Sequence, residues 1–507
     1  MTDQPVVERE VERKISVPPV FTVPDFLAAI PAAQSVERGA PLELLVTYYD
    51  TADLRLARWG LTLRRRRGGK DEGWHLKLPA WKGAVGDRDE IQLPLGDATD
   101  VVPEVFRDAV APLVRGSVLV PVATLRTSRT PVELQGADGL LVRIVDDTVS
   151  IEDGPRLLAR FRELEVELVG DDYSSLDAAV NALLDAGGSI GTRPKLVSAL
   201  GPRAMAPADV PALDFGDLDS PSTVAVSATI AQYVRAFLLQ DVRVRLDLPE
   251  SVHQMRVSAR RLRSALRTFR PLLNVEWADG LRDSLATAAG SLGDARDLEV
   301  QRKRLDRDAD LLPAESRDVA RKLIDKVLIQ RQQLARDAGL AQLRSAEHAA
   351  LIEELIDAAV SPQFSAIAWR SASETLPELM TSAWNRLAKE VRRLDAQADE
   401  DQWHRARIVA KRARYAAEAL APVLGDDVSD LAFELAAVTD ELGILQDTAV
   451  ARELIADIAQ HEKGTAASGY ALGLLDGVEV AAAIECRENF WFVWPAARKA
   501  ARRAGAR

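Results

Sequence analysis

Cysteine and histidine, the residues of disulfide frameworks and of many metal clusters, are scarce in this sequence. Among 507 residues there is one cysteine, Cys486, and there are five histidines. A lone cysteine excludes an intramolecular disulfide and a cysteine zinc cluster, and it fits a reducing compartment. We therefore expect the protein in the cytoplasm.

Long apolar runs are also lacking. No stretch reaches the roughly 20 uncharged apolar residues of a membrane helix, and the charged, alternating N-terminus resembles neither a signal peptide nor a transit peptide. We expect no membrane partner. The net charge of -12 argues against a specific or general nucleic-acid partner, because binding a polyanion needs a strongly positive field. Any anion site must therefore be local.

The length predicts two to four domains, and 47% hydrophobic with 28% charged residues is ordinary for a folded chain. Up to about residue 200, short alternating segments between Gly, Pro and Asp turns indicate an antiparallel sheet or barrel. These segments are EVERKISV, LLVTYYDT, GLTLRRRR, WHLKLPA, RDEIQLPL, ATLRTSRTPVEL, LLVRIVDD and RELEVELVG. Helical spacing interrupts them at residues 23–30, 102–114 and 176–186, so residues 1–200 are predicted to be an α+β domain.

The composition changes after residue 200. Residues 201–223 are rich in Pro, Gly, Ala and Asp, lack periodicity and are predicted to be a linker. Residues 224–507 carry apolar residues at i, i+3, i+4 and i+7, which predicts an all-α bundle.

The helical half repeats itself. The residues His253, Arg256, Arg260 and Arg263 recur 151 positions later as His404, Arg407, Lys411 and Arg414. The loop motif LGDARDLEV, from Leu292, is answered 150 positions later by LGILQDTAV. We infer a tandem duplication, with repeats at about 224–365 and 375–507.

Charged residues occupy in-register positions on strand after strand of the first domain. Glu10, Glu12 and Lys14 share one face by the two-residue period. Later strands add Arg64, Arg66, Lys77, Arg88, Glu90, Arg126, Glu163, Glu165 and Glu167. Any one such strand could simply expose a charged face to solvent. However, the opposite face of the first strand is not cleanly apolar, and acids and bases are grouped by strand.

These groupings favour a wet barrel interior that holds water, metal and an anion, because unpaired buried charges are costly. The matching chemistry is phosphoryl transfer on a linear triphosphate, where positioning and charge neutralisation supply most of the catalysis. Arg and Lys would clamp phosphate oxygens, and Glu-x-Glu pairs would offer hard oxygen ligands to Mg²⁺ or Mn²⁺.

The sequence resembles the CYTH family of triphosphate tunnel enzymes over nearly all of residues 6–200. The motifs that carry the resemblance are EVERK, YYDT, LRRRR, HLKLP, RDE, RTSR, a VDD turn, ELEVEL and RPKLVSAL. The resemblance implies an eight-stranded antiparallel tunnel barrel with triphosphatase-like activity. It implies metal binding by Glu10, Glu12, Asp147, Glu165 and Glu167, a catalytic role for Lys14 beside Glu10 and Glu12, and phosphate binding by Arg64, Arg66, Lys77, Arg88, Arg126 and Lys195.

Two positions stay open in this comparison. The family's aspartate could be Asp146 or Asp147, and we favour Asp147 on its spacing to Val149. Where the family often shows Lys-x-Arg, this chain has Thr124 before Arg126, so one base is either missing or supplied by Arg129.

In the second half, His253, Arg256, Arg260, Arg263 and Arg267 fall within about 80° of helical arc, over roughly 20 Å. The second copy, His404, Arg407, Lys411 and Arg414, forms another such ridge. A row of like charges is repulsive unless an anion lies along it, although a solvated helix face is the simpler alternative. Repetition of the residue types in register favours a polyanion, and the spacing makes the histidines poor metal-ligand candidates.

This half resembles the CHAD family of conserved-histidine α-helical domains, across roughly residues 224–500. The resemblance implies two pseudo-symmetric four-helix bundles that bind inorganic polyphosphate through the two ridges. Arg296, Asp297, Gln446 and Asp447 are expected to hold the helices together rather than to touch the ligand.

Two functions follow. The first is a metal-dependent hydrolase of inorganic triphosphate or a related compound, recruited to polyphosphate, and to polyphosphate granules, by its helical half. The second is a non-catalytic polyphosphate-binding protein whose barrel senses phosphate ligands. A cyclase is less favoured because nothing recognises a nucleobase, and stacking of Trp59, Trp74 or Trp81 on a thiamine compound is undecided.

Overall fold

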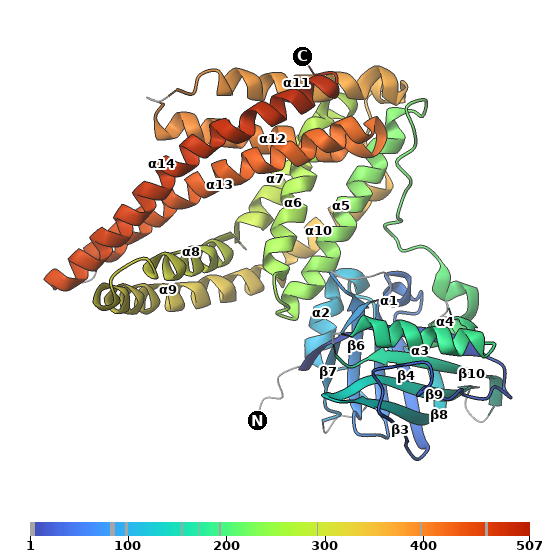
Figure 1. Cartoon of the computed structure of the whole chain (residues 1–507). Helices are drawn as coiled ribbons and strands as arrows, with labels where there is room; N and C mark the ends of the chain where they lie inside the picture. The colour runs from blue at the N-terminus through green and yellow to red at the C-terminus, as the bar shows by residue number, and fades with distance from the viewer. Residues whose placement is uncertain are drawn as a thin grey trace. The chain divides into compact units, whose positions relative to one another are not determined.

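The computed structural model describes residues 6–81, 87–96, 100–153, 156–170, 172–191, 194–291, 293–395, 398–461 and 465–506. It divides the chain into two compact units, Met1–Asp209 and Val210–Arg507, called here the N-terminal unit and the helical unit (Figure 1). The predicted linker, residues 201–223, contains the 3-10 helix η1 (Gly201–Met205), and the first long helix begins at Ser222. Leu292 and Arg193, which belong to two of the motifs above, lie outside the described residues.

The N-terminal unit is built on one curled antiparallel sheet with the strand order β1-β7-β6-β5-β4-β8-β9-β10-β2-β11. The strands are β1 (Val6–Glu10), β2 (Glu12–Val17), β3 (Ser35–Arg38), β4 (Leu42–Asp50), β5 (Thr62–Arg67), β6 (Gly73–Pro79), β7 (Arg88–Leu93), β8 (Val120–Gly136), β9 (Gly139–Asp153), β10 (Arg156–Leu168) and β11 (Ser189–Ile190). Because β1 pairs with β7 and β2 pairs with β10, the first segment of the chain closes the sheet into a barrel.

The strand count differs from the predicted eight for identifiable reasons. β1 and β2 form one segment that is interrupted at Val11, whose carbonyl accepts a hydrogen bond from Leu168 N at 2.9 Å. The short strands β3 and β11 each pair with a single neighbour and add nothing to the ring. The ring itself has eight strand positions, so the predicted α+β tunnel barrel is confirmed.

The outer face of the barrel is more apolar than the sequence suggested. Val11 and Ile15, on the outer face of the first segment, are buried in a cluster with Leu164 of β10. The helix α3 (Tyr173–Asp185) covers this cluster with Leu176 and Leu183. The charged positions of the same strands are therefore left to face inward.

Two of the three predicted helices form, as α2 (Glu104–Val114) and α3. The third, at residues 23–30, is wrong: the chain makes turns there, with only a single helical turn at Phe26 to Ile30. Val23 and Ile30 each precede a proline, which disfavours the helical conformation of the preceding residue. The short helices α1 (Arg55–Arg58) and α4 (Lys195–Leu200) were not predicted.

The helical unit shows the duplication in its elements. The first repeat contains α5 (Ser222–Arg245), α6 (Ser251–Thr268), η2 (Arg270–Leu272), α7 (Val275–Ser291), α8 (Gly293–Ala309), α9 (Ala314–Leu343) and α10 (Ala346–Val360). The second contains α11 (Ala372–Val391), α12 (Glu400–Leu424), α13 (Asp426–His461) and α14 (Ala466–Arg503), after η3 (Ala366–Trp369). The sequence offset matches α5 with α11, α6 with α12 and α9 with α14, while α7 and α8 together match α13.

The two repeats meet at equivalent positions. Pro221 pairs with Ser371, which lies 150 residues later, at the starts of α5 and α11. The ridge helices α6 and α12 pack against each other. The predicted architecture is confirmed, with α10 as an addition to the first repeat.

Two helices of the described part, α5 and α14, are long and apolar enough to span a membrane when judged by length and composition alone. α5 is largely buried within its bundle, as the core helix of a folded domain would be. The expectation of no membrane partner stays a prediction.

Candidate functional site

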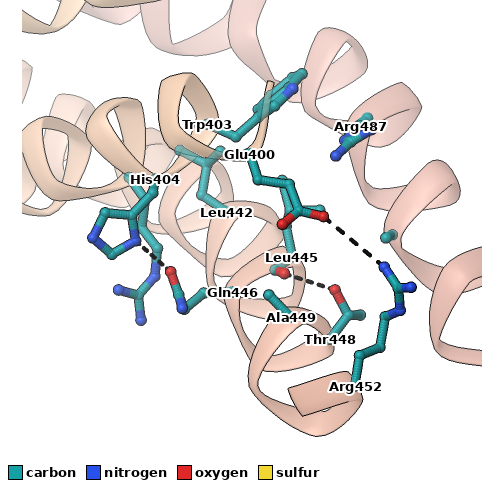
Figure 2. A pocket seen from close by; sticks show the side chains of 12 residues that line it. Glu400, Trp403, His404, Leu442, Leu445, Gln446, Thr448, Ala449, Arg452 and Arg487 are labelled. Carbon is teal, nitrogen blue, oxygen red and sulfur yellow. Dashed lines mark hydrogen bonds and ion pairs between the residues drawn. The ribbon is translucent and has the colours of Figure 1, made fainter. Parts of the chain in front are cut away.

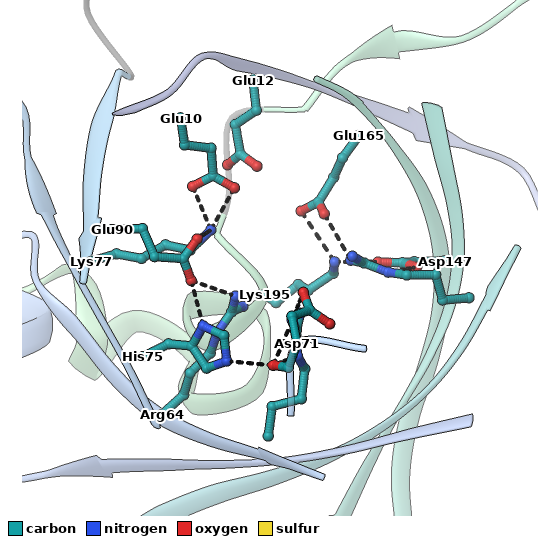
Figure 3. Close-up of polar contacts among 12 residues, drawn as sticks. Glu10, Glu12, Arg64, Asp71, His75, Lys77, Glu90, Asp147, Glu165 and Lys195 are labelled. Carbon is teal, nitrogen blue, oxygen red and sulfur yellow. Dashed lines mark hydrogen bonds and ion pairs between the residues drawn. The ribbon is translucent and has the colours of Figure 1, made fainter. Parts of the chain in front are cut away.

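The barrel encloses a cavity of roughly 990 Å³ whose walls carry both acids and bases. Figure 3 shows these side chains pointing from the surrounding strands toward the interior. Of the predicted barrel residues, the following line the cavity: Glu10, Glu12, Lys14, Arg64, Arg66, Lys77, Arg88, Glu165, Glu167 and Lys195. The charged faces of these strands therefore point into the barrel and not to solvent.

The register of the sheet brings these residues together. Lys14 lies opposite Glu165, and Glu12 lies opposite Glu167, where β2 pairs with β10. On the other edge of the same first segment, where β1 pairs with β7, Glu10 lies opposite Arg88. Directly opposed residues of an antiparallel pair point to the same face, so one inward position fixes the others.

Opposite charges pair across the interior. Lys77 Nζ donates to Glu10 Oε1 at 2.7 Å, and Lys14 Nζ donates to Glu165 Oε1 at 2.8 Å. Burial alone would raise the pKa of Glu165, but Lys14, Lys195 and Arg129 outweigh it and hold this pKa well below its usual range. Lys14, opposed by burial but favoured by Glu165 and Glu12, has a pKa well above its ordinary value and stays protonated.

Asp147 takes the inward position that the sequence favoured over Asp146. Its fully buried carboxylate accepts hydrogen bonds from Arg129 Nε at 2.8 Å and Nη2 at 2.6 Å, and it also pairs with Lys195. Asp146 instead accepts a hydrogen bond from Arg162 Nε. Asp147 therefore lies beneath two bases, where it can position Arg129 and Lys195.

Arg126 does not belong to the interior, so its prediction as a phosphate-binding residue is wrong. Its side chain is 53% exposed and pairs with Glu152 at 3.1 Å. The alternation of β8 places Leu125, Thr127 and Arg129 on the inner face, and Arg129 lines the cavity. The base that the RTSR strand contributes is Arg129, which the sequence offered only as a substitute.

Sequence reasoning missed a buried histidine. His75 Nδ1 lies 2.8 Å from Glu90 Oε1, and Arg64 Nη2 donates to the same oxygen at 3.2 Å. Burial, together with Arg64 and Arg66, lowers the pKa of His75 to about 4, so the ring is neutral near pH 7. His75 could have been recognised as an inward residue because it lies directly opposite Arg64 in the hairpin of β5 and β6. That pairing is known only from the structure, and so the sequence did not reveal it.

The acids of the cavity suit a divalent cation chemically. Burial, followed by the charge of Glu165 and opposed by that of Arg129, raises the pKa of Glu167 to about 7, with Glu10 and Glu12 adding to the rise. Carboxylate oxygens are the ligands that Mg²⁺ and Mn²⁺ prefer. In the described ranges no group of three His, Cys, Asp or Glu side chains is close enough to hold a metal by itself, and the acids face Lys14, Lys77 and Arg129 instead.

In the helical unit the first ridge divides into two groups. Arg260 acts electrostatically on Arg407 and Lys411 of α12. Arg263 and Arg267 instead lie near Arg282 of α7. Burial, followed by Arg407 and Arg260, lowers the pKa of Lys411 to about 8.

Three of the remaining ridge residues, Arg256, Arg414 and His404, have protein partners, whereas for His253 only electrostatic neighbours such as Arg296 and Glu250 are seen in the described residues. Arg256 Nη1 donates to Asp297 at 2.8 Å and to the Gly293 carbonyl at 2.9 Å, and Arg414 pairs with Glu418 at 2.8 Å. His404 Nδ1 lies 2.5 Å from Gln446 Oε1, beside a cavity of about 40 Å³ that is too small for a phosphate chain (Figure 2).

The motif acids act on ridge arginines in both repeats, but within the described residues only the first repeat shows a direct ion pair. Asp297 lies on α8 and Asp447 on α13, so the motif is helical and the expected loop is wrong. Asp297 accepts hydrogen bonds from Arg256, and Asp447, at the equivalent position of the duplication, opposes Arg407 electrostatically.

Comparisons with known proteins agree with both halves. The CYTH domain model matches residues 8–194, and the CHAD domain model matches residues 228–456. Uncharacterized protein MT2285 of Mycobacterium tuberculosis is 33% identical over 528 aligned residues, covering 99% of this chain and 98% of its own. Among solved structures, PptA from Streptomyces chartreusis is 23% identical with a TM-score of 0.48, covering 54% of this chain and all of its own. The CHAD domain of the plant Ricinus communis is 27% identical with a TM-score of 0.43, covering 54% and 91%.

The chain therefore belongs to the proteins that join a CYTH domain, of the triphosphate tunnel family, to a CHAD domain. The CYTH family is metal-dependent in general.

Proposed function

We propose that the N-terminal unit hydrolyses inorganic triphosphate or a related triphosphate compound with Mg²⁺ or Mn²⁺, and that the helical unit binds inorganic polyphosphate. The observation that carries the proposal is the closed barrel with a cavity of roughly 990 Å³, lined by acids and bases together. A linear chain of phosphates and a divalent cation would satisfy both kinds of charge at once.

The bases would hold the phosphate oxygens. Arg64, Arg66, Lys77 and Arg88 line one side of the cavity, and Arg129 and Lys195 line the other. Guanidinium groups bind phosphate through paired N–H donors, which orients the chain as well as neutralising it. Glu90 and Asp147, each held by basic neighbours, would keep Arg64 and Arg129 in place before the substrate arrives.

Glu10, Glu12, Glu165 and Glu167 would hold the cation, which supplies charge neutralisation at phosphate oxygens and a more acidic water. Lys14, which pairs with Glu165 and Glu12, would donate hydrogen bonds and position a phosphate or the attacking water. Asp147 lies too deep beneath Arg129 to serve as a ligand unless that pair opens.

In the helical unit, Arg260, Arg407 and Lys411 would form the centre of the polyphosphate site. They share one region between α6 and α12, and burial, followed for Lys411 by the like charges of Arg407 and Arg260, lowers the pKa values of Arg407 and Lys411. The proposal includes a cytoplasmic location, with association to polyphosphate granules.

The competing function is a polyphosphate-binding protein whose barrel only senses phosphate ligands. Phosphate release from tripolyphosphate, measured on the full chain with Mg²⁺, with Mn²⁺ and with EDTA, separates the two. We expect release with a divalent cation and none with EDTA. Binding of tripolyphosphate without any release would favour the sensor.

A further inference from the structure

A second cavity in the helical unit lies away from the centre of the ridges. Its volume is roughly 690 Å³, and α6, α7, α11 and α12 line it. Each of these helices contributes an arginine: Arg267, Arg282, Arg386 and Arg412, respectively. The site is a pocket between helices, and not a single charged helix face.

These arginines are short of acidic partners. Asp279 pairs with Arg282 at 2.6 Å and also with Arg270 at 2.8 Å, so its charge is already shared. Within the described part of the chain, Arg267, Arg386 and Arg412 form no hydrogen bond or ion pair through their side chains. Burial, followed by Arg282 and Arg386, lowers the pKa of Arg412, and burial, followed by Arg412 and Arg282, lowers that of Arg267.

A hydroxyl in the same wall is also left without a partner. Ser264 lines the cavity, is 8% exposed, and its Oγ forms no hydrogen bond. Buried hydroxyls normally have a partner, so Ser264 adds one unsatisfied polar group to the wall of this cavity.

The duplication shows that this pocket is not a necessity of the fold. At the offset of 151 residues, Arg412 corresponds to Arg261, and Arg267 corresponds to Glu418. In that other repeat position the two residues form an ion pair, with Arg261 Nε donating to Glu418 at 3.0 Å, and Glu418 also pairs with Arg414 at 2.8 Å. In the pocket, Arg267 occupies the position that corresponds to the acid Glu418 in the other repeat. The positive charge of Arg412 is therefore not balanced by an acid at that position.

We propose that this pocket is a binding site for a compact oligophosphate of the size of pyrophosphate or tripolyphosphate, distinct from the barrel and from the Arg260, Arg407 and Lys411 cluster. Four guanidinium groups that converge from four helices match an anion with several charged oxygens in a small volume. The ligand could arrive as a free oligophosphate or as the end of a long chain held along α6, since Arg267 belongs to the same helix as Arg260. The site does not depend on hydrolysis in the barrel.

The test measures how fast each arginine is chemically modified, one residue at a time, in the full-length protein. Phenylglyoxal modification would be followed peptide by peptide by mass spectrometry, with tripolyphosphate, with long-chain polyphosphate or with neither, in EDTA. Arg405, exposed on α12 and free of side-chain partners in the described residues, is the internal control. We expect tripolyphosphate to slow the modification of Arg386 and Arg412 at least fivefold and to leave Arg405 unchanged.

Protection by tripolyphosphate supports a free oligophosphate as the ligand. Protection by long-chain polyphosphate alone, lost in Arg260→Gln/Lys411→Gln, supports the end of a bound chain. Equal protection of Arg405, no protection by either phosphate, or protection only by a poly-glutamate peptide would overturn the proposal.

A variant pair checks the binding directly. Arg386→Gln/Arg412→Gln should remove one class of tripolyphosphate site in calorimetric titration, whereas Lys389→Gln/Arg405→Gln, with the same charge change on the same helices, should retain it. Barrel hydrolysis should be equal in both variants, so a failed hydrolysis assay would not affect this result. Retention of the site in the first variant would refute the assignment.

Discussion

The structure places Arg129, and not Arg126, on the inner face of β8. Substituting each arginine in turn tests this assignment. Arg129→Ala removes three hydrogen bonds, at 2.8 and 2.6 Å to Asp147 and 3.1 Å to Glu165. Breaking a buried ion pair by removing one partner costs about 3–5 kcal/mol. Asp147 keeps Lys195, and Glu165 keeps Lys14 and Lys195, so we expect the lower end of that range, about 3 kcal/mol.

The matched control is Arg126→Ala, which breaks only an exposed pair with Glu152, worth about 0–1 kcal/mol. For a unit of this size, roughly 2–4 °C of melting temperature corresponds to 1 kcal/mol. Differential scanning calorimetry should therefore show a fall of roughly 6–12 °C in one transition for Arg129→Ala and of no more than about 4 °C for Arg126→Ala. Equal shifts, or a larger one for Arg126→Ala, would refute the register assigned to β8.

Two further predictions concern pH and local stability. Because Lys411 has a lowered pKa of about 8, it loses its proton as the pH rises through that value, so affinity for long-chain polyphosphate should fall by roughly tenfold from pH 7 to pH 9 at constant ionic strength. The drop should flatten in Lys411→Arg, which stays charged, and an unchanged drop in that variant would exclude Lys411 as its source. In the YYDT motif, the buried Asp50 carboxylate accepts hydrogen bonds from the backbone N–H groups of Thr51, Leu56 and Ala57. Asp50→Ala should therefore cost roughly 3 kcal/mol in urea unfolding, while Asp53→Ala, at a largely exposed side chain, should cost under about 1 kcal/mol, and the reverse order would contradict this assignment.

Much of the barrel could be predicted because a strand's period of two is local information. All eight predicted alternating segments became strands, and the charged face of the first segment is the inner one. The alternation of β8 was not enough, because its inner face changes from Leu125 and Thr127 to Arg129 along the strand. Only the pairing with β9, which sets Arg129 against Asp147, shows which of the two arginines is inside.

In the helical unit, too, the sequence predicted which residues share a helix face but not their contacts. The helical period places five residues of α6 on one arc, but it does not tell what packs against each of them. Arg256 meets Asp297 from α8, and Arg267 meets Arg412 from α12 and Arg282 from α7. The second pocket depends on residues from four helices, and no single periodic pattern in the sequence contains them.

The central claim is that carboxylates of the barrel hold a divalent cation for triphosphate hydrolysis. The most direct measurement is phosphate release from tripolyphosphate across a titration of Mg²⁺ or Mn²⁺, comparing the wild type with Glu10→Gln/Glu12→Gln. We predict saturable, metal-dependent release in the wild type and a loss of at least a hundredfold in the variant at every metal concentration, with polyphosphate binding by the helical unit unchanged. Metal-independent release, equal release by the variant, or no release by a wild type that still binds polyphosphate would contradict the account.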